Sequence, residues 1–119
     1  MIRITNQTRS STIADRGELA RSFISRLRGL MGRASLEDGS GLIIYPEWSI
    51  HTFFMRFPID VLFVDRSDRV MTVVAALVPN RPYAGALGAR YVIELPVGRI
   101  AASGTQAGDQ LLLEPSPHR

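Results

Sequence analysis

The chain has 119 residues, of which 45% are hydrophobic and 21% are charged, and it contains no cysteine. These values are ordinary for a folded domain with one hydrophobic core, and they argue against a disordered chain. The lack of cysteine excludes disulfides, thiolate metal ligands and a cysteine nucleophile. We therefore expect residues 1–119 to form a single domain.

The 14 basic residues are all arginine, yet the net formal charge is only +3. No basic run alternates with aromatic residues, so the sequence does not favour nucleic-acid binding. No apolar stretch approaches the ~20 residues of a membrane span, and residues 1–15 show no secretory signal. We expect a cytoplasmic protein with no nucleic-acid partner, no membrane partner and no cofactor.

The principal helix is predicted near the N-terminus. Weak alternation in residues 1–14 favours two short edge strands around a turn. From Glu18 to Met31 the apolar residues recur with helical spacing, within an arc of about 100°. Gly29 or Gly32 is expected to end this helix. The apolar stripe consists of Ala20, Phe23, Ile24, Leu27, Leu30 and Met31.

Arginines border this stripe on both sides, which allows two interpretations. A basic amphipathic helix can lie on a membrane surface, but long cationic side chains also commonly extend beside a stripe that faces a core. We expect the second arrangement, with Phe23, Leu27 and Leu30 packed on the β core and no membrane binding. The bordering residues are Arg21, Arg26, Arg28 and Arg33.

After a turn at residues 37–41 the sequence becomes typical of β-structure. Five runs are rich in branched and aromatic residues and are separated by turn-forming residues. Asp65–Arg69 is expected to be the turn of a hairpin. One helical turn at 98–107, a last strand at Gln110–Leu113 and a tail at 115–119 follow. The five runs are Leu42–Tyr45, His51–Met55, Ile59–Val64, Val70–Val78 and Tyr91–Leu95.

Several short strands with turn signals between them predict a mainly β fold. We expect a compact antiparallel barrel or jelly-roll-like sandwich that carries one principal helix. In this fold Asp60 and Glu94 each lie within an apolar strand, and both strands are expected to be covered on both faces.

Several blocks of this chain, spread in order over about residues 15–113, resemble the domain-of-unknown-function family 192. The resemblance implies a compact β-rich domain with a helix near its start, and it brings no activity and no catalytic residue. The family often has Trp where this chain has Phe54. The blocks are Arg28-Gly29-Leu30-Met31, Gly41-Leu42-Ile43-Ile44, residues 50–61 from Ile50 to Val61, residues 89–98 from Ala89 to Gly98, and Gly108-Asp109.

The two acids in apolar strands need partners, because an unpaired buried charge is costly. Each of Asp60 and Glu94 is expected either to be structural or to line a pocket. A structural carboxylate would accept backbone N–H bonds or pair with an arginine. The candidate arginines are Arg28, Arg56, Arg90 and Arg99.

His51 is one of two histidines and stands among apolar and aromatic residues. It is expected to be either a hydrogen-bonded core residue or part of a site. With Asp60 and Glu94 it could form an acid–base set or a metal site with two acids and one histidine. The spacing between the three residues matches no local metal-ligand motif, so we expect no metal.

The function favoured by the sequence is a small binding module. A pocket that mixes aromatic, arginine and carboxylate groups suits a polar small molecule, a carbohydrate or a short peptide. One alternative is a hydrolase-type enzyme with Asp60 and Glu94 as acid and base. Another is a protein–protein interaction module. The predicted binding residues are His51, Phe53, Arg56, Asp60 and Glu94.

Overall fold

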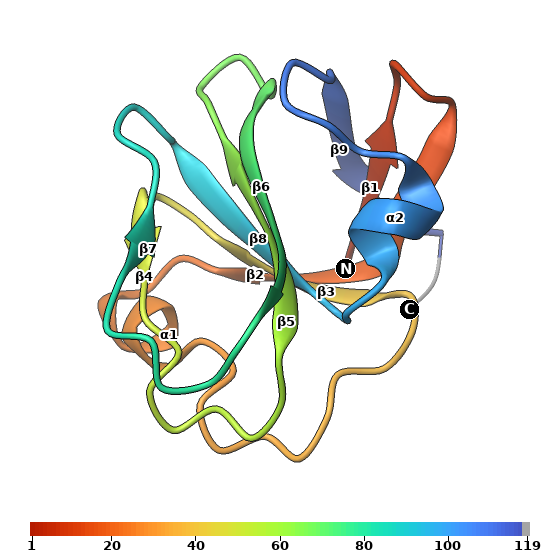
Figure 1. The fold of residues 1–119 in the computed structure, drawn as a ribbon. Coiled ribbons are helices and arrows are strands. Elements are labelled where there is room, and N and C mark those ends of the chain that lie inside the picture. The colour runs from red at the N-terminus through yellow and green to blue at the C-terminus, as the bar shows by residue number, and fades with distance from the viewer. Residues whose placement is uncertain (118–119) are drawn as a thin grey trace.

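The computed structural model describes residues 1–117 and shows a mainly β protein, as predicted (Figure 1). Residues 118 and 119, the end of the predicted tail, lie outside the described residues. The strands are β1 Ile2–Asn6, β2 Ser11–Ala20, β3 Ser40–Ile44, β4 Ser49–Ile50, β5 Ile59–Val64, β6 Val70–Leu77, β7 Ala84–Gly85, β8 Tyr91–Leu95 and β9 Leu111–Pro115, and the helices are α1 Phe23–Arg28 and α2 Arg99–Ser103.

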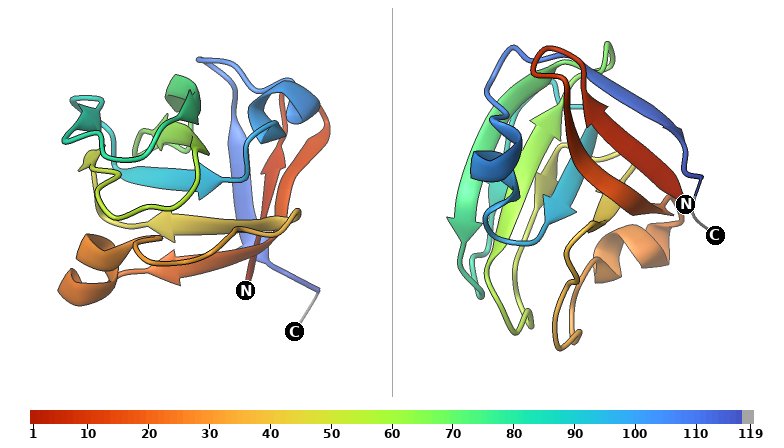
Figure 2. Two further views of the ribbon diagram at one scale, coloured as in Figure 1. Left: turned by 60° about the horizontal axis from the view of Figure 1, so that its bottom comes forward. Right: turned by 90° about the vertical axis from the view of Figure 1, so that its right-hand side faces the viewer.

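Seven strands form one curled sheet in the order β6-β5-β8-β3-β2-β1-β9, which gives the half-barrel shape seen in Figure 2. The strands β4 and β7 form a separate two-stranded sheet. The expected hairpin at residues 65–69 joins β5 to β6, where Asp65 Oδ1 accepts hydrogen bonds from the backbone N–H groups of Ser67 and Arg69 at 2.8 and 3.0 Å.

The seven-stranded sheet is mostly antiparallel, as predicted, with one parallel pair that the sequence did not indicate. Strands β2 and β3 run parallel, with Glu18 opposite Leu42 and Ala20 opposite Ile44. Parallel neighbours cannot be joined by a tight hairpin and need a crossover of about a dozen residues or more. Residues 21–39 provide this crossover, and they carry α1.

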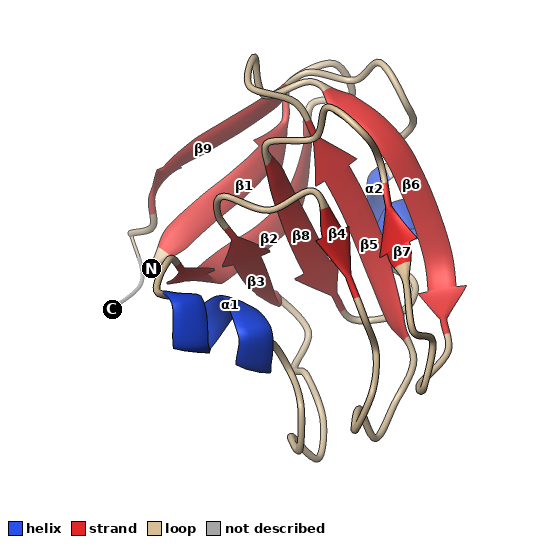
Figure 3. Cartoon of the chain, turned by 90° about the vertical axis from the view of Figure 1, so that its left-hand side faces the viewer, coloured by secondary structure: helices blue, strands red, loops and turns tan. Residues whose placement is uncertain are grey.

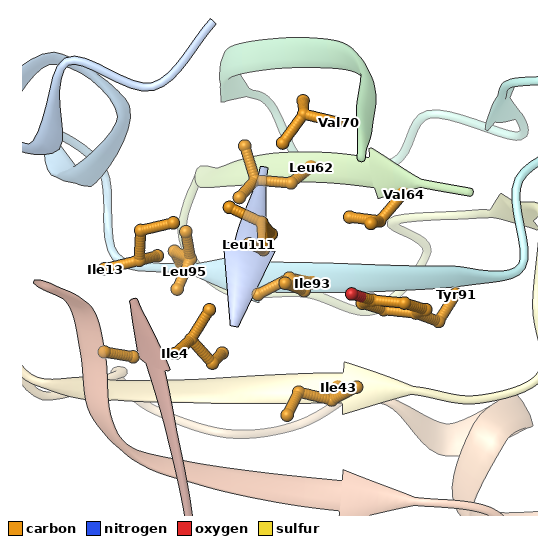
Figure 4. Close-up of a cluster of buried hydrophobic side chains, with 11 residues drawn as sticks. Ile4, Ile13, Ile43, Leu62, Val64, Val70, Tyr91, Ile93, Leu95 and Leu111 are labelled. Carbon is orange, nitrogen blue, oxygen red and sulfur yellow. The ribbon is translucent and has the colours of Figure 1, made fainter. Parts of the chain in front are cut away.

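Both faces of the sheet are covered, which is why all six residues of β5 are buried. The first core lies inside the curl, because it joins side chains from strands at both ends of the sheet order. Figure 4 shows this core, with Ile4 of β1, Leu62 of β5 and Ile93 of β8 among its members. The second core lies on the outer face and contains Val61 of β5 and Val92 of β8.

The predicted helix is much shorter than its apolar pattern. Residues 18–20 belong to β2, because they pair with β3, and α1 has only six residues. The Ser22 side chain caps α1 and accepts a hydrogen bond from the Ser25 N–H group at 3.0 Å. A second short helix, α2, forms within the stretch for which one helical turn was expected.

The prediction that the apolar stripe packs on the core is confirmed for Ala20 and Leu30, which flank α1 and are buried, but it is wrong for α1 itself. Phe23, Ile24 and Leu27 are 70%, 69% and 56% exposed, and no residue of α1 is buried. The outer core is instead covered by residues outside the helix, such as Leu30 and Met55. Because these side chains already occupy the outer face, the helix stands beside it.

A buried polar cluster ties the β1–β2 turn to the segment before β9. Asp109 Oδ2 accepts hydrogen bonds from Asn6 Nδ2 and Arg9 Nε, both at 3.0 Å, and from the Gln106 N–H group at 3.0 Å. Burial alone would raise the pKa of Asp109, but the hydrogen bonds from Arg9, Asn6 and Gln106 and the charge of Arg9 together outweigh it and hold that pKa below its ordinary value of 3.8. Both helices within residues 1–117 are too short to span a bilayer.

Candidate functional site

Glu94 is the buried acid of the outer face. It lies in β8 and stands opposite Leu42 of β3 and Val61 of β5, which belong to the outer core. The residue is only 2% exposed, and its Oε1 atom has no hydrogen-bond partner among residues 1–117. Burial raises the pKa of the Glu94 carboxyl to about 8, and the charge of Arg33 opposes part of that shift. The carboxyl is therefore mostly protonated at neutral pH.

A cleft of about 250 Å³ opens above this carboxyl. Figure 3 shows α1 and the β4–β7 pair on the same side of the seven-stranded sheet. The lining includes residues of α1 and β4 and the segment just before β7. The floor is formed by Glu94 and Ile44. The remaining lining residues are Arg26, Leu27, Gly29, Glu47, Ser49, Ile50, His51, Pro82 and Tyr83.

Gly29 lets the chain pass close to Glu94 at the end of α1. Its φ is +50°, a conformation that side chains disfavour. A Cβ atom at this position would lie 3.5 Å from Glu94 Oε1. Glycine therefore both ends the helix and keeps the space over the carboxyl open.

Two polar side chains of the cleft are held by backbone contacts. Arg26 Nη1 donates a hydrogen bond to the Pro46 carbonyl at 3.0 Å, while its buried Nε has no partner within the described part of the chain. His51 Nδ1 accepts a hydrogen bond from the Phe53 N–H group at 3.1 Å. The neutral His51 ring consequently carries its proton on Nε2.

Asp60 has a structural role on the other face of the sheet. Its Oδ1 accepts a hydrogen bond from the Ala76 N–H group at 2.9 Å. Its Oδ2 accepts hydrogen bonds from the N–H groups of Gly98 and Ile100 at 3.1 and 2.9 Å. These bonds fasten β6 and the start of α2 to β5. The sequence allowed either backbone N–H groups or an arginine as the partner of Asp60, and the structure shows backbone N–H groups.

The structure thus brings together only part of the predicted binding set. His51 and Glu94 line the cleft, and the Phe53 ring lies beside it, 5.5 Å from the His51 ring. Arg56 is exposed and does not line the cleft. Asp60 faces the inner core, so it cannot form an acid–base pair or a metal site with Glu94. Within residues 1–117, no group of three or more histidine or acidic residues is placed to hold a metal ion.

Several lining residues were not predicted from the sequence. Tyr83 follows a Pro-rich turn and belongs to no periodic pattern, so nothing marked it. Arg26 and Leu27 were assigned to a helix packed on the core. Gly29 was noted as a helix end, and its place in the Arg28-Gly29-Leu30-Met31 block was the signal that could have pointed to the cleft.

Two relatives of this chain are named only as UPF0127 proteins, a name that assigns no activity. A UPF0127 protein of Thermococcus sibiricus is 36% identical over 91% of this chain and 72% of its own length. A UPF0127 protein of Pyrococcus abyssi is 35% identical over 91% of this chain and 94% of its own length.

A solved structure supports the fold. It is the crystal structure of a protein of unknown function from Novosphingobium aromaticivorans, which is 29% identical, with a TM-score of 0.81 over 93% of this chain and 82% of that chain. The model of the DUF192 family, described as "Uncharacterized ACR", matches residues 3–113. The chain therefore belongs to the DUF192 family, the family that its sequence blocks resemble.

Proposed function

We propose that this protein is a binding module that holds a neutral hydrogen-bonding group of its ligand in the cleft over Glu94. The observation that carries the proposal is the buried Oε1 of Glu94, which has no partner within residues 1–117. Leaving a buried polar group unsatisfied costs about 1–3 kcal/mol. A ligand that satisfies this atom recovers that cost, whereas a purely structural acid such as Asp60 has its partners already.

The charge state of Glu94 selects the type of ligand group. With a pKa of about 8, the carboxyl offers one O–H donor and one carbonyl acceptor at neutral pH. A carboxamide presents the matching acceptor and donor side by side. A cationic group is less suitable, because Arg26 lines the cleft and the charge of Arg33 also acts on Glu94.

The walls and the size of the cleft set the rest of the ligand. Leu27, Ile50 and Tyr83 line the cleft and provide apolar contact. The volume of about 250 Å³ is below the roughly 300–1,000 Å³ of sites for drug-sized molecules. The cleft is therefore suited to a small ring or to one side chain of a larger ligand.

Benzamide tests this proposal, because it combines a small ring with a carboxamide. The pKa of Glu94 is measured by ¹³C NMR of its carboxyl carbon, with and without benzamide. Binding to the protonated acid should raise that pKa further, since the ligand favours the protonated form. Glu94→Leu should abolish the chemical-shift changes that benzamide causes around the cleft.

The controls separate this result from non-specific binding. Glu114→Gln, on β9 and away from the cleft, should leave benzamide binding unchanged. Toluene, which lacks the amide, should leave the Glu94 pKa unchanged. The proposal would be contradicted if benzamide caused chemical-shift changes of the same size in the Glu94→Leu protein as in the parent. It would also be contradicted if benzamidine bound more tightly than benzamide and lowered the Glu94 pKa.

A second candidate function is proton transfer, which the raised pKa of Glu94 favours. General acids and bases are most effective when their pKa lies near the working pH, and His51 lines the same cleft. Glu94→Gln preserves the shape of the side chain but removes the titrating proton. The parent and this variant are assayed for hydrolysis of nitrophenyl esters and glycosides. An activity of the parent that the variant loses would support an enzymatic function, and an activity that the variant retains would exclude Glu94 as the acid.

A further inference from the structure

The cleft is surrounded by large apolar side chains that remain exposed in the described part of the chain, and one of them, Tyr83, packs edge-on against Trp48 with the ring centroids 6.3 Å apart. Leu27 and Tyr83 line the cleft and are 56% and 60% exposed. We call the surface made by these two residues and their exposed neighbours the cleft rim. Its members are Phe23, Ile24, Leu27, Phe53, Phe54 and Tyr83.

Several members of the rim lie beside one another or beside the cleft. The Phe53 ring lies 5.5 Å from the ring of His51, a cleft residue, and 6.5 Å from the ring of Phe54. The Phe54 carbonyl accepts a hydrogen bond from the Gly32 N–H group at 3.0 Å, so this loop lies against the segment that follows α1. Phe23 and Ile24 precede Leu27 by four and three residues and share its face of the helix. A group of exposed apolar side chains around a cleft is typical of an interaction site.

The charges beside the rim are predominantly positive. Arg26 lines the cleft, and Arg28 follows in the last turn of α1. Arg81 is joined through its backbone to Thr52, between His51 and Phe53, by hydrogen bonds of 2.8 and 2.9 Å. Glu47 is the acidic side chain of the lining besides Glu94. The surface is thus complementary to a partner that is both apolar and acidic.

Two kinds of partner combine these properties, an acidic protein segment and an anionic lipid surface. The shape of the site favours the protein segment. A bilayer would cover the exposed rim but has no single group to place on the polar floor of a small cleft. A polypeptide can lay apolar side chains on the rim and insert one side chain between α1 and Tyr83.

We propose that the cleft and its rim bind an acidic, apolar segment of a partner protein, with one asparagine or glutamine side chain of that segment placed over Glu94. This proposal rests on the proposed function, because the same cleft receives the carboxamide. The apolar residues of the segment contact the rim, and its carboxylates lie near Arg26 and Arg81. Electrostatic complementarity of this type sets partner choice and association rate more than affinity.

The test uses the full chain, immobilised, and two synthetic libraries of short peptides. The first contains a central Asn or Gln flanked by random Leu, Phe, Asp and Glu, and the second replaces Asp and Glu with Lys. Peptides should be selected from the acidic library and not from the basic one, and their binding should weaken as salt is raised. Equal selection from both libraries, or no selection from either, would overturn the proposal.

Surface variants locate the binding of the selected peptides. Two double variants should each weaken binding about tenfold or more, as for a central contact in an interface. One combines Phe23→Ser with Leu27→Ser, and the other combines Arg26→Glu with Arg81→Glu. The matched controls, Leu112→Ser on β9 and Arg66→Glu in the β5–β6 turn, should bind as the unmodified protein does. Because Phe23 and Leu27 are exposed, their variants should keep the far-ultraviolet circular dichroism spectrum of the parent.

The alternative partner and the underlying function are distinguished by two further outcomes. If no peptide is selected, the protein is tested for co-sedimentation with phosphatidylcholine–phosphatidylserine vesicles. Co-sedimentation that the double variant Phe23→Ser with Leu27→Ser abolishes would show a lipid-docking surface and overturn the proposal. Benzamide binding without peptide selection would overturn this inference and leave the proposed function standing. Selected peptides that bind Glu94→Leu as tightly as the parent would overturn the placement of an Asn or Gln side chain over Glu94, and the benzamide measurement would then decide the proposed function separately.

Discussion

Asp60 and Glu94 lie on neighbouring antiparallel strands and point to opposite faces of the same sheet. Glu94 stands opposite Val61, and Asp60 stands opposite Leu95, so the two carboxylates are offset by one position. Asp60 faces the inside of the curl and accepts three backbone hydrogen bonds. Glu94 faces outward, where its Oε1 has no partner within the described chain. One register step therefore separates a structural acid from a candidate binding group.

Glu94 should make the stability of this protein depend on pH. Its pKa is about 8 in the folded protein and has an ordinary value of 4.5. Between these values the folded state holds a proton that the unfolded state has lost, so the free energy of unfolding should fall as pH rises. The slope should approach about 1.4 kcal/mol per pH unit.

Urea denaturation across this pH window measures the effect. The Glu94→Gln protein should lack this dependence and be more stable than the parent above about pH 8. Glu114→Gln should keep the dependence, because Glu114 is a half-exposed residue of the β9 edge. A parent protein whose stability does not change between about pH 4.5 and 8 would show that the Glu94 pKa is not raised.

Asp60→Ala should strongly destabilise the fold. The substitution leaves three backbone N–H groups at β6 and α2 without their acceptor, and a lost charge-assisted hydrogen bond is worth about 1.5–3 kcal/mol. We expect a loss of at least about 3 kcal/mol in the free energy of unfolding, with Asp60→Asn less affected because its amide oxygen still accepts. An unchanged denaturation midpoint in the Ala variant would contradict this account.

Leu27→Ala and Leu30→Ala should differ sharply in stability although the residues are neighbours in the stripe. Leu30 is 1% exposed and belongs to the outer core, so its truncation should cost about 2–5 kcal/mol. Leu27 is mostly exposed, and its truncation should change the free energy of unfolding by less than about 0.5 kcal/mol. Chemical denaturation of both variants checks this, and equal losses would mean that α1 packs on the core after all.

The cluster around Asp109 should contribute to acid sensitivity. The pKa of Asp109 lies below its ordinary value of 3.8 in the folded protein, so its stabilising effect is fully present above that value. It should be lost as the pH falls through the folded pKa. Asp109→Asn should be less stable than the parent at neutral pH and should lose less stability on acidification. Acid unfolding followed by circular dichroism compares the two proteins, and identical curves would contradict the prediction.

The strands were predictable where local composition and burial agree. Residues 59–64 form a continuous apolar run, and this is what a strand with both faces covered requires. The turn at 65–69 was predictable because Asp65 supplies its own side-chain acceptor. The position of Glu94 in an apolar strand likewise marked it from the sequence alone.

Features that depend on distant pairing were not predictable. The helical period of residues 18–31 runs across the end of β2, α1 and a turn, and pairing with β3 decides where the helix starts. Residues 51–55 have the composition of a strand, yet they form a loop in which Phe54 has a φ of +63°. No local sequence pattern indicates the strand register that places Asp60 and Glu94 on opposite faces, or the position of Tyr83 in the lining of the cleft.

The parallel pairing of β2 with β3 has a consequence for how this protein can be altered. One wall of the cleft belongs to the crossover at 21–39, whereas Glu94 belongs to a strand in the interior of the sheet. The wall can therefore be exchanged by grafting a different crossover between Ala20 and Ser40, provided that the graft keeps Leu30 and Leu36, which cover the outer core of the sheet. Natural variation elsewhere in this segment would change the shape of the cleft while the strand that carries Glu94 stays the same.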